Sequence, residues 1–319
     1  MINFSIVTVV KNDLAGLRKT RLALENQTYI HWKHIIIDSA STDGTLEFLQ
    51  ELPTTNTIFT SEQDSGIYCA MNKGWRCAEE NSFVLFLNAN DTFAFENSLT
   101  IAAKSFLENP QSDWGATVHE EISRDGKHWV SKLVSPVSIS NQLYAFGYRS
   151  HQSVVMRASF IKTLKGFNET YQFAADWDLI VRGILLSKPI EWWHALGRFE
   201  LGGYSSKYIL ESHLELKMLR KIYLPQTIRR KFFEAVWETI YLRNMGYKSF
   251  LTFWLNFIVK LIDRFKSVLF NFLSFFNFSR SQTSKTPTKS FWTKLIEVTH
   301  FNLEIEPYYG ELTGTYEKN

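Results

Sequence analysis

Cysteine is scarce in this sequence. Among 319 residues only Cys69 and Cys77 occur, and their spacing matches neither a disulfide framework nor a zinc site. This scarcity argues against a small disulfide-stapled secreted domain and fits a reducing cytoplasm. Residues 1–5 also lack the basic segment that opens a signal peptide, so we expect none.

Long apolar runs and strong charge are lacking as well. The stretch 249–259 is uncharged and mostly apolar, but it is too short to span a bilayer, which takes about 20 residues. The net charge of +3 is too small to indicate nucleic acid as a partner. Neither a Gly-x-Gly-x-x-Gly turn nor a Walker lysine loop occurs, which excludes the common glycine-rich phosphate sites.

The clearest positive signal is an apolar run at residues 83–87, followed at once by short, mostly polar residues at 88–91. The run predicts a strand buried on both faces, whose carboxyl end opens into the crevice where open α/β sheets bind ligands. Asp91 is the first acidic group to emerge there. A carboxylate in that crevice can hold a divalent cation against a diphosphate. A solvated turn at a strand end is the alternative, and these nine residues alone do not decide between the two.

Strand-like segments alternate with helical periodicity before this run. Strands are expected at 4–10, 34–37 and 57–61, with helices opening at 12–13, at 39–45 and near 71–74. This alternation predicts an α/β fold with a mostly parallel sheet and right-handed crossovers.

Three of the expected strands lead into acidic loops, which contain Asp38, Asp64 and Asp91. Because the carboxyl ends of parallel strands share one edge of a sheet, we expect these side chains to gather in one crevice. Each aspartate alone is better explained as a helix cap or a turn former, and only their recurrence favours a site.

A series of short motifs resembles the family 2 glycosyltransferases, in the same order and at similar intervals. The motifs lie at 5–8, 38–45, 64–74, 87–91, 151–153, 166–169, 174–179 and 202–205. The resemblance covers roughly residues 1–225. It implies a GT-A fold with helices flanking the sheet, a nucleotide-diphosphate sugar donor, a divalent cation (Mn²⁺ or Mg²⁺) and inversion at the anomeric carbon.

The resemblance also implies a role for individual residues of the first half. Asp91 would be the metal ligand, and Asn90 would contact the ribose. This sequence has Asn at positions 88 and 90, where relatives often carry acidic residues; an amide keeps a carbonyl oxygen but no charge. The donor diphosphate would therefore supply much of the metal coordination. The expected nucleotide-sugar-binding residues are Thr8, Val10, Asp38, Asp64, Lys73, Asn90 and Asp91.

For the second half, the resemblance makes Asp176 the candidate general base, because the acceptor hydroxyl must lose its proton to a group within hydrogen-bond reach. Apolar spacing after it predicts that Asp176 and Asp178 begin a helix, where an aspartate can also be only a cap. His151 and Gln152 are expected on the acceptor side near the reaction centre. Trp177 would stack on a sugar or simply pack.

Residues 113–134 predict an antiparallel excursion, with a hairpin turn at 124–127. The acidic run 119–121 resembles a metal site, but it lacks a second histidine at ligand spacing. We therefore expect His119, Glu120 and Glu121 on the surface.

The domain organisation follows from shifts in composition. We expect a catalytic domain at 1–225, with a nucleotide-sugar half at 1–112 and an acceptor half at 113–225. A basic, aromatic-rich helical extension at 226–278 suits a membrane interface, although a helical subdomain packing on the core or on a second copy is the alternative. A flexible linker is expected at 279–290, and a tail at 291–319 without an assigned function.

These expectations combine into a hexosyltransferase-type enzyme of bacterial surface-polysaccharide synthesis, such as O-antigen, capsule or exopolysaccharide. Its acceptor would be a glycan, in many relatives lipid-linked, and its place the cytoplasmic face of the cell membrane. A catalytically weakened relative that binds nucleotide sugar or serves as a scaffold is the alternative, motivated by Asn90 and Ala175. A nucleotidyltransferase is less favoured, because the loop after the first strand is neither Gly-rich nor the expected basic loop.

Overall fold

The computed structural model describes residues 1–123, 126–131, 135–144, 149–202, 207–227, 231, 234 and 310–311. Nearly all of them belong to one compact unit that includes Met1–Leu224. The helices are α1 (Leu14–Glu25), α2 (Thr45–Glu51), α3 (Ile67–Arg76), α4 (Ser98–Glu108), α5 (Ile139–Leu143), α6 (Ala158–Thr163), α7 (Ala175–Leu186) and α9 (Ile209–Tyr223), with a 3₁₀ turn, η1, at His151–Ser153.

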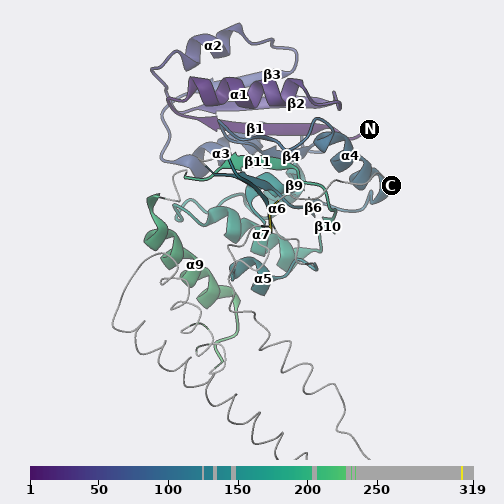
Figure 1. Ribbon diagram of the computed structural model, residues 1–319, viewed down its shortest axis with the longest axis vertical. Coiled ribbons are helices and arrows are strands. Elements are labelled where there is room, and N and C mark those ends of the chain that lie inside the picture. Colours follow the sequence, from purple (N-terminus) through teal and green to yellow (C-terminus); the bar gives the residue numbers. More distant parts are fainter. Residues whose placement is uncertain are drawn as a thin grey trace, which may run out of the picture. The chain divides into compact units, whose positions relative to one another are not determined.

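The larger of two sheets has seven strands in the order β10-β6-β9-β4-β1-β2-β3 (Figure 1). Strands β4, β1, β2 and β3 are mutually parallel, and β9 joins them antiparallel to β4. This confirms the predicted α/β class with a mostly parallel sheet. Its strands are β1 (Phe4–Val10), β2 (Trp32–Asp38), β3 (Thr57–Ser61), β4 (Phe83–Phe86), β6 (Trp114–Ala116), β9 (Val154–Arg157) and β10 (Ile190–Glu191).

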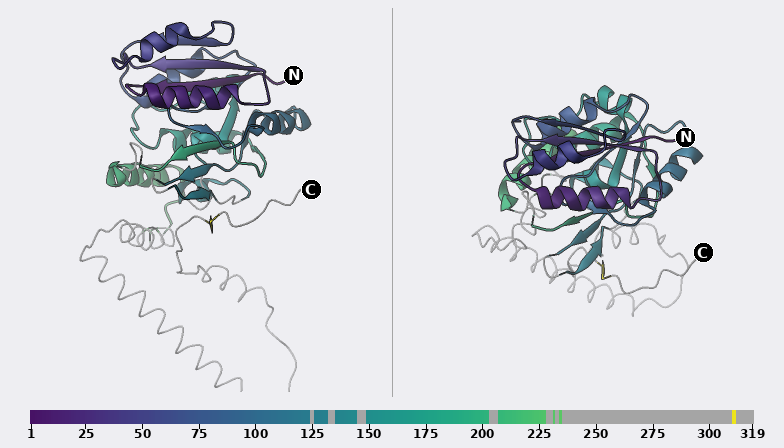
Figure 2. Two further views of the ribbon diagram at one scale, coloured as in Figure 1. Left: turned by 45° about the horizontal axis from the view of Figure 1, so that its top comes forward. Right: turned by 90° about the horizontal axis from the view of Figure 1, so that it is seen from above.

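The continuous apolar runs form strands because both faces of this sheet are covered. Along β1, Val7 and Val9 pack in one core cluster with Trp75 of α3, whereas Phe4 and Ile6 join a second cluster under α1 and α4. Figure 2 shows α1 lying along the sheet. Asp13 caps α1 as expected, since its side chain accepts a hydrogen bond from the Gly16 N–H.

A second sheet has the order β12-β8-β7-β11-β5. Its strands β7 and β8 form the predicted antiparallel hairpin, and Gly126 at its turn has a φ of +80°, a conformation that favours glycine. Two residues of that turn, 124 and 125, lie outside the described residues. The strands are β5 (Thr92–Phe93), β7 (Glu120–Ile122), β8 (His128–Val130), β11 (Gly197–Glu200) and β12 (Gly310–Glu311).

The surface position predicted for residues 119–121 is wrong. His119 and Glu121 are 0% exposed and Glu120 is 3% exposed, because residues from distant segments pack on both faces here: Ser150 and Ser153 contact the His119 ring, and Arg198 binds Glu120. Their polar groups are paired, as burial requires. Glu120 binds Arg198 at 2.6 Å, and the His119 ring lies 3.1 Å from the Glu121 carboxylate.

Most of the predicted helical extension at 226–278, all of the linker at 279–290 and most of the tail lie outside the described residues, as does most of the motif at 202–205. Within the part of the chain that is described, no helix combines the length and the apolar character needed to cross a membrane.

Candidate functional site

The turn after β4 closes on itself. The Asp91 N–H donates to the Asn88 carbonyl at 3.0 Å, and the Asn88 N–H donates to Oδ2 of Asp91 at 3.1 Å. From α1, the Thr20 hydroxyl donates to the carbonyl of Asp91 at 2.7 Å. Asn90 has a φ of +75°, a region that asparagine tolerates better than most residues. These contacts hold the Asp91 carboxylate over the end of the strand.

Asp91 is largely buried, with 8% of its surface exposed. Gln152 of η1 donates its Nε2 hydrogen to Oδ2 of Asp91 at 3.0 Å. Burial raises the pKa of Asp91 to about 6, although His151 and the Gln152 hydrogen bond act in the opposite direction. Gly197 packs against Gln152, and a Cβ atom on residue 197 would lie only 2.7 Å from atoms of Gln152.

Asp176 lies in the first turn of α7, 7% exposed, where the helix dipole favours a negative charge. Its Oδ1 accepts a hydrogen bond from the Trp177 N–H at 2.9 Å. The Tyr68 hydroxyl lies 3.3 Å from the same oxygen and 2.9 Å from the carbonyl of Phe173, so its one hydrogen is shared between these two acceptors. Burial and the nearby Asp176 raise the pKa of Tyr68 well above its usual value, so Tyr68 stays a donor. Beneath Asp176 and His151 lies a small apolar hollow lined by residues such as Phe86.

His151 connects the two carboxylate neighbourhoods. Its Nδ1 lies 3.3 Å from Oδ2 of Asp176, and its Nε2 lies 3.2 Å from Nδ2 of Asn88. Since an amide nitrogen only donates, Nε2 must accept, and the ring proton then resides on Nδ1, facing Asp176. The order Asp176, His151, Asn88 is therefore one directed chain of hydrogen bonds that ends in the Asp91 turn.

Helix α9 supports the start of α7. The Glu215 carboxylate accepts hydrogen bonds from three consecutive backbone N–H groups at 2.8–2.9 Å, those of residues 172–174. At the far end of α9, the Tyr223 hydroxyl donates to Asp178 at 2.7 Å, and Arg182 binds the same carboxylate at 2.8 Å. Asp178 thus joins two helices and faces away from the Asp176 cluster.

The residues at the ends of β1 and β2 are placed differently. Val10, Asp38 and Ser61 are aligned across β1, β2 and β3, so these strands end at one edge as expected. Thr8 is fully buried, and its hydroxyl donates to the carbonyl of Leu87 at 2.7 Å. Asp38 is also fully buried, and it accepts hydrogen bonds from the hydroxyl groups of Ser41 and Ser61.

Asp64 and Lys73 lie together at the loop after β3. Asp64 accepts a hydrogen bond from the Gly66 N–H at 3.0 Å, just before α3. Lys73 of α3 binds Glu62 at 2.7 Å, and this contact raises the pKa of the lysine. Asp64 therefore stabilises the turn before α3, and Lys73 lies near its carboxylate.

The side chains around Asp91 fit a hard cation. No group of three or more His, Cys, Asp or Glu side chains is arranged to hold a metal within the described ranges. Amide oxygens, however, are also ligands for Mg²⁺ and its relatives. Oδ1 of Asn88 and Oε1 of Gln152 are buried acceptors without a hydrogen-bond partner. Such orphaned oxygens beside a carboxylate suit a cation.

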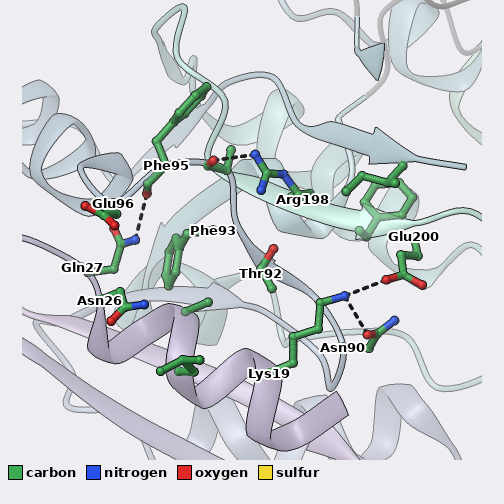
Figure 3. Close-up of a pocket in the computed structure, with 15 residues that line it drawn as sticks. Lys19, Asn26, Gln27, Asn90, Thr92, Phe93, Phe95, Glu96, Arg198 and Glu200 are labelled. Atoms are coloured by element: carbon green, nitrogen blue, oxygen red, sulfur yellow. Dashed lines mark hydrogen bonds and ion pairs between the residues drawn. The ribbon is translucent and has the colours of Figure 1, made fainter. Parts of the chain in front are cut away.

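A cavity of about 540 Å³ adjoins this cluster without containing it. Figure 3 shows it between α1 and the strands β5 and β11, with Lys19 and Arg198 among its lining residues. Lys19 reaches both Oδ1 of Asn90 at 3.0 Å and Glu200 at 2.6 Å. Asn90 is shared by the cavity and the Asp91 turn, whereas Asp91, His151 and Asp176 do not line the cavity.

Three contributing residues had no role in the prediction from sequence. Tyr68 occurred in a recognised motif without an assigned function, and Thr20 and Glu215 read as ordinary helix positions. Each acts through a contact more than 40 positions away along the chain. Local periodicity carries no signal for contacts of that kind.

The sequence profile described as Glycosyl transferase family 2 matches residues 5–165, about half of the chain. The matched part includes the Asp91 turn and η1 but ends before Asp176. The chain belongs to glycosyltransferase family 2 and is a glycosyltransferase enzyme.

Curated proteins that resemble this chain share about a quarter of its residues over the aligned region. An uncharacterized glycosyltransferase of Mycobacterium tuberculosis is 27% identical over 207 residues, which cover 63% of this chain and 76% of that protein. A PGL/p-HBAD biosynthesis glycosyltransferase of Mycobacterium bovis is 26% identical, over 56% of this chain and 68% of its own. The O-antigen biosynthesis protein RfbC of Myxococcus xanthus is 27% identical over 56% of this chain, but over only 14% of RfbC.

Solved structures share the fold at low sequence identity. S. aureus TarS 1-349 in complex with UDP-GlcNAc has a TM-score of 0.56 at 17% identity, covering 76% of this chain and 72% of that one. The mannosyltransferase PcManGT from Pyrobaculum calidifontis, in complex with GDP-Man and Mn²⁺, has a TM-score of 0.50 at 16% identity, covering 70% and 65%. The predicted GT-A type of fold is therefore confirmed.

Proposed function

We propose that this chain transfers a sugar from a nucleotide-diphosphate sugar to a hydroxyl of a glycan, with inversion and with a divalent cation. The observation that carries the proposal is the hydrogen-bonded chain from Asp176 through His151 and Asn88 into the Asp91 turn. It joins a candidate base to a candidate metal carboxylate, from segments almost 90 positions apart. Complexes of fold relatives with UDP-GlcNAc and GDP-Man support a nucleotide-sugar donor.

In this reaction the acceptor hydroxyl gives its proton to Asp176, and its oxygen bonds to the anomeric carbon. The bond from that carbon to the diphosphate breaks, and the leaving nucleoside diphosphate keeps the electron pair. A bound divalent cation, held by Asp91, would act as a Lewis acid on the leaving charge. His151 and the backbone N–H of Trp177 each contact one oxygen of Asp176, which keeps the carboxylate in place for the proton.

The donor nucleotide would lie at the shared edge of β1, β2 and β3. Val10, Asp38 and Asp64 border that edge, and Lys73 lies close to Asp64. Because the hydroxyl of Thr8 and the carboxylate of Asp38 are occupied inside the fold, their role is to shape the pocket. Gln152 and Trp177 would border the reaction centre on the acceptor side.

The acceptor belongs with the extracellular polysaccharides in this proposal. Relatives named for PGL/p-HBAD and O-antigen biosynthesis support an acceptor of that class, and a lipid-linked one agrees with the basic, aromatic-rich composition of residues 226–278. Contact of this segment with the inner face of the cell membrane is part of the proposal, as is its separation from the catalytic domain near residue 225.

Calorimetric titration of the full chain with UDP and GDP tests the donor site. We expect one of them to bind in the presence of Mn²⁺ or Mg²⁺, and binding to weaken with EDTA and in Asp91→Ala. Incubation with the matching nucleotide sugar should then release the nucleoside diphosphate. A chain that binds no nucleoside diphosphate, whatever its base, would contradict the proposal.

One observation favours a catalytically weakened relative as the second candidate. At Asn90, where relatives often carry an acid, the amide oxygen is already bound by Lys19 at 3.0 Å, so a positive charge lies beside the turn. In this alternative the chain binds nucleotide sugar but does not transfer it. Nucleotide binding without any release of diphosphate from the sugar donor would select it.

A further inference from the structure

We infer that the amide oxygens of Asn88 and Gln152 complete the cation site of Asp91, so that one charged and two neutral oxygen ligands come from this chain. The inference rests on the proposed function and adds a ligand set that acidic spacing does not reveal. It begins with two buried acceptors, Oδ1 of Asn88 and Oε1 of Gln152, which have no hydrogen-bond partner.

The nitrogen of each amide has a hydrogen-bond partner within the cluster. Nδ2 of Asn88 faces the His151 ring at 3.2 Å, and Nε2 of Gln152 donates to Oδ2 of Asp91 at 3.0 Å. Reversing the Gln152 amide would bring two acceptor oxygens together, and reversing Asn88 would remove the donor that Nε2 of His151 accepts. The hydrogen bond to Asp91 therefore holds the amide oxygen of Gln152 in the unpartnered position, and the amide oxygen of Asn88 is unpartnered when Nε2 of His151 carries no proton.

Asp91 has capacity left for a cation too. Both donors that reach its carboxylate, the Asn88 N–H and Nε2 of Gln152, bind Oδ2. No hydrogen bond within the described part of the chain reaches Oδ1. Three oxygens without donors thus occur on residues that already touch one another.

An unpaired buried carbonyl oxygen is costly, and two in one cluster need a common explanation. A hard cation accepts oxygen ligands of either charge and satisfies several of them at once. A cation explains both orphaned amides, the open carboxylate oxygen and the preference for amides over additional acids at this turn.

The test is a titration of the full chain with Mn²⁺, alone and with UDP, in which free Mn²⁺ is followed by electron paramagnetic resonance. Gln152→Met keeps the length of the side chain but removes its oxygen, and we expect Mn²⁺ affinity to fall by about tenfold or more. Gln152→Glu retains an oxygen at similar reach and should bind Mn²⁺ at least as tightly as the wild type. A residue that served only to anchor Asp91 through its N–H would weaken binding in both variants.

Asn88→Cys provides a readout that positioning alone cannot produce. A thiolate ligand prefers soft metals, so the ratio of Cd²⁺ to Mn²⁺ affinity should rise by about tenfold or more over the wild type. Asn109→Cys is the matched control, because Asn109 is an exposed amide at the end of α4 and donates to the carbonyl of Ser105 in the same helix. This control should bind Mn²⁺ alone like the wild type, and thermal melting should show that all variants are folded.

Three results would each overturn the ligand set. The first is wild-type Mn²⁺ affinity in Gln152→Met, and the second is an unchanged ratio of Cd²⁺ to Mn²⁺ affinity in Asn88→Cys. The third is the lack of saturable Mn²⁺ binding by the wild type. The proposed function would survive any of these results if UDP or GDP still bound and transfer still occurred. Failure of nucleotide binding together with metal binding would instead count against the function itself.

Discussion

Strands β2 and β4 end at the same edge of the sheet, and a buried aspartate lies at or just after the end of each. The two carboxylates differ in how many of their oxygens accept hydrogen bonds. Both oxygens of Asp38 are occupied by hydroxyl and backbone donors from Ser41 and Ser61. Asp91 receives donors at one oxygen only and has orphaned amide oxygens beside it. A carboxylate with a full set of donors stabilises a loop, whereas one with open capacity can take a ligand.

Two aspartates at the start of α7 provide a second comparison, between a carboxylate of the proposed site and one bound to Arg182, and here the largest effect is expected. Asp176→Asn should reduce the rate of sugar transfer by about 10²- to 10⁴-fold, because the general base is lost. The variant should also lose some stability, because its amide nitrogen would face the Nδ1–H donor of His151, so rates are compared at a temperature where thermal melting shows that it is folded. Steady-state kinetics with the matched donor measures the rate, and transfer at the wild-type rate would remove Asp176 from the role of base.

Asp178 is the second aspartate of this comparison, and its carboxylate is bound by two side chains inside the fold. Asp178→Asn should lower the free energy of unfolding by about 3 kcal/mol, because the buried carboxylate binds Arg182 and Tyr223. Chemical denaturation measures the loss. At a temperature where this variant is folded, the rate of transfer should remain much closer to the wild type than in Asp176→Asn; an equal loss of activity would mean that the two aspartates act as one unit.

Asp38 and Asp91 can be set against each other by the same substitution. Asp38→Asn should destabilise the protein by about 1–3 kcal/mol, because donors to its carboxylate lose an acceptor inside the fold. Asp91→Asn should leave the metal-free protein as stable as the wild type or more so at pH 7, since burial raises the pKa of Asp91 to about 6 and makes its ionised form costly. Paired thermal melts in EDTA decide this, and a marked loss of stability in Asp91→Asn would remove the contrast.

At neutral pH the smallest effect is expected from titration of His34, a buried residue of β2 outside the proposed site. Burial, with a smaller contribution from Arg21, lowers the pKa of His34 to about 3. Its folded pKa lies below the unfolded value of about 6.5, so the unfolded chain binds the extra proton between these values. The contribution of His34 to stability is therefore fully present above about pH 6.5 and falls, by up to ~1.4 kcal/mol per pH unit, as the pH drops toward 3.

Denaturant midpoints measured from pH 7 to pH 4 test this sign. The variant His34→Gln should be less stable at pH 7, but its midpoint should depend less on pH. The hydroxyl of Thr8 lies 2.9 Å from the His34 ring and donates to the carbonyl of Leu87, so this titration is linked through β1 to the residue that precedes the Asp91 turn. An equal pH dependence in the variant would assign the effect to other groups.

Much of the donor half could be predicted from sequence because its signals are local. The bounds of β1 and β3 agree with the predicted residues, and the start of α7 at Ala175 was expected from apolar spacing. Burial on both faces makes such strands continuous apolar runs, which are recognisable without any partner. The polar turns that follow were recognisable for the same reason.

The second sheet and the inner contacts of the site could not be predicted in this way. Alternation around residues 119–121 suggested one exposed face, but β11, almost 80 positions further along the chain, covers β7 and supplies Arg198 to Glu120. The contact of His151 with Asp176, and the orientation of the amides that it fixes, depends likewise on segments brought together only by folding. Residue identity predicted which side chains lie in the candidate site, but not which of their oxygen atoms lack a hydrogen-bond donor.

The two attachments of α9 to α7 have a mechanical consequence. Glu215, in the middle of α9, binds the backbone just before α7, and Tyr223, the last residue of α9, binds Asp178 within α7. The two helices are therefore joined at two separate points on α9. A change at Glu215 would shift the start of α7, and with it Asp176, without altering any residue of the turn after β4.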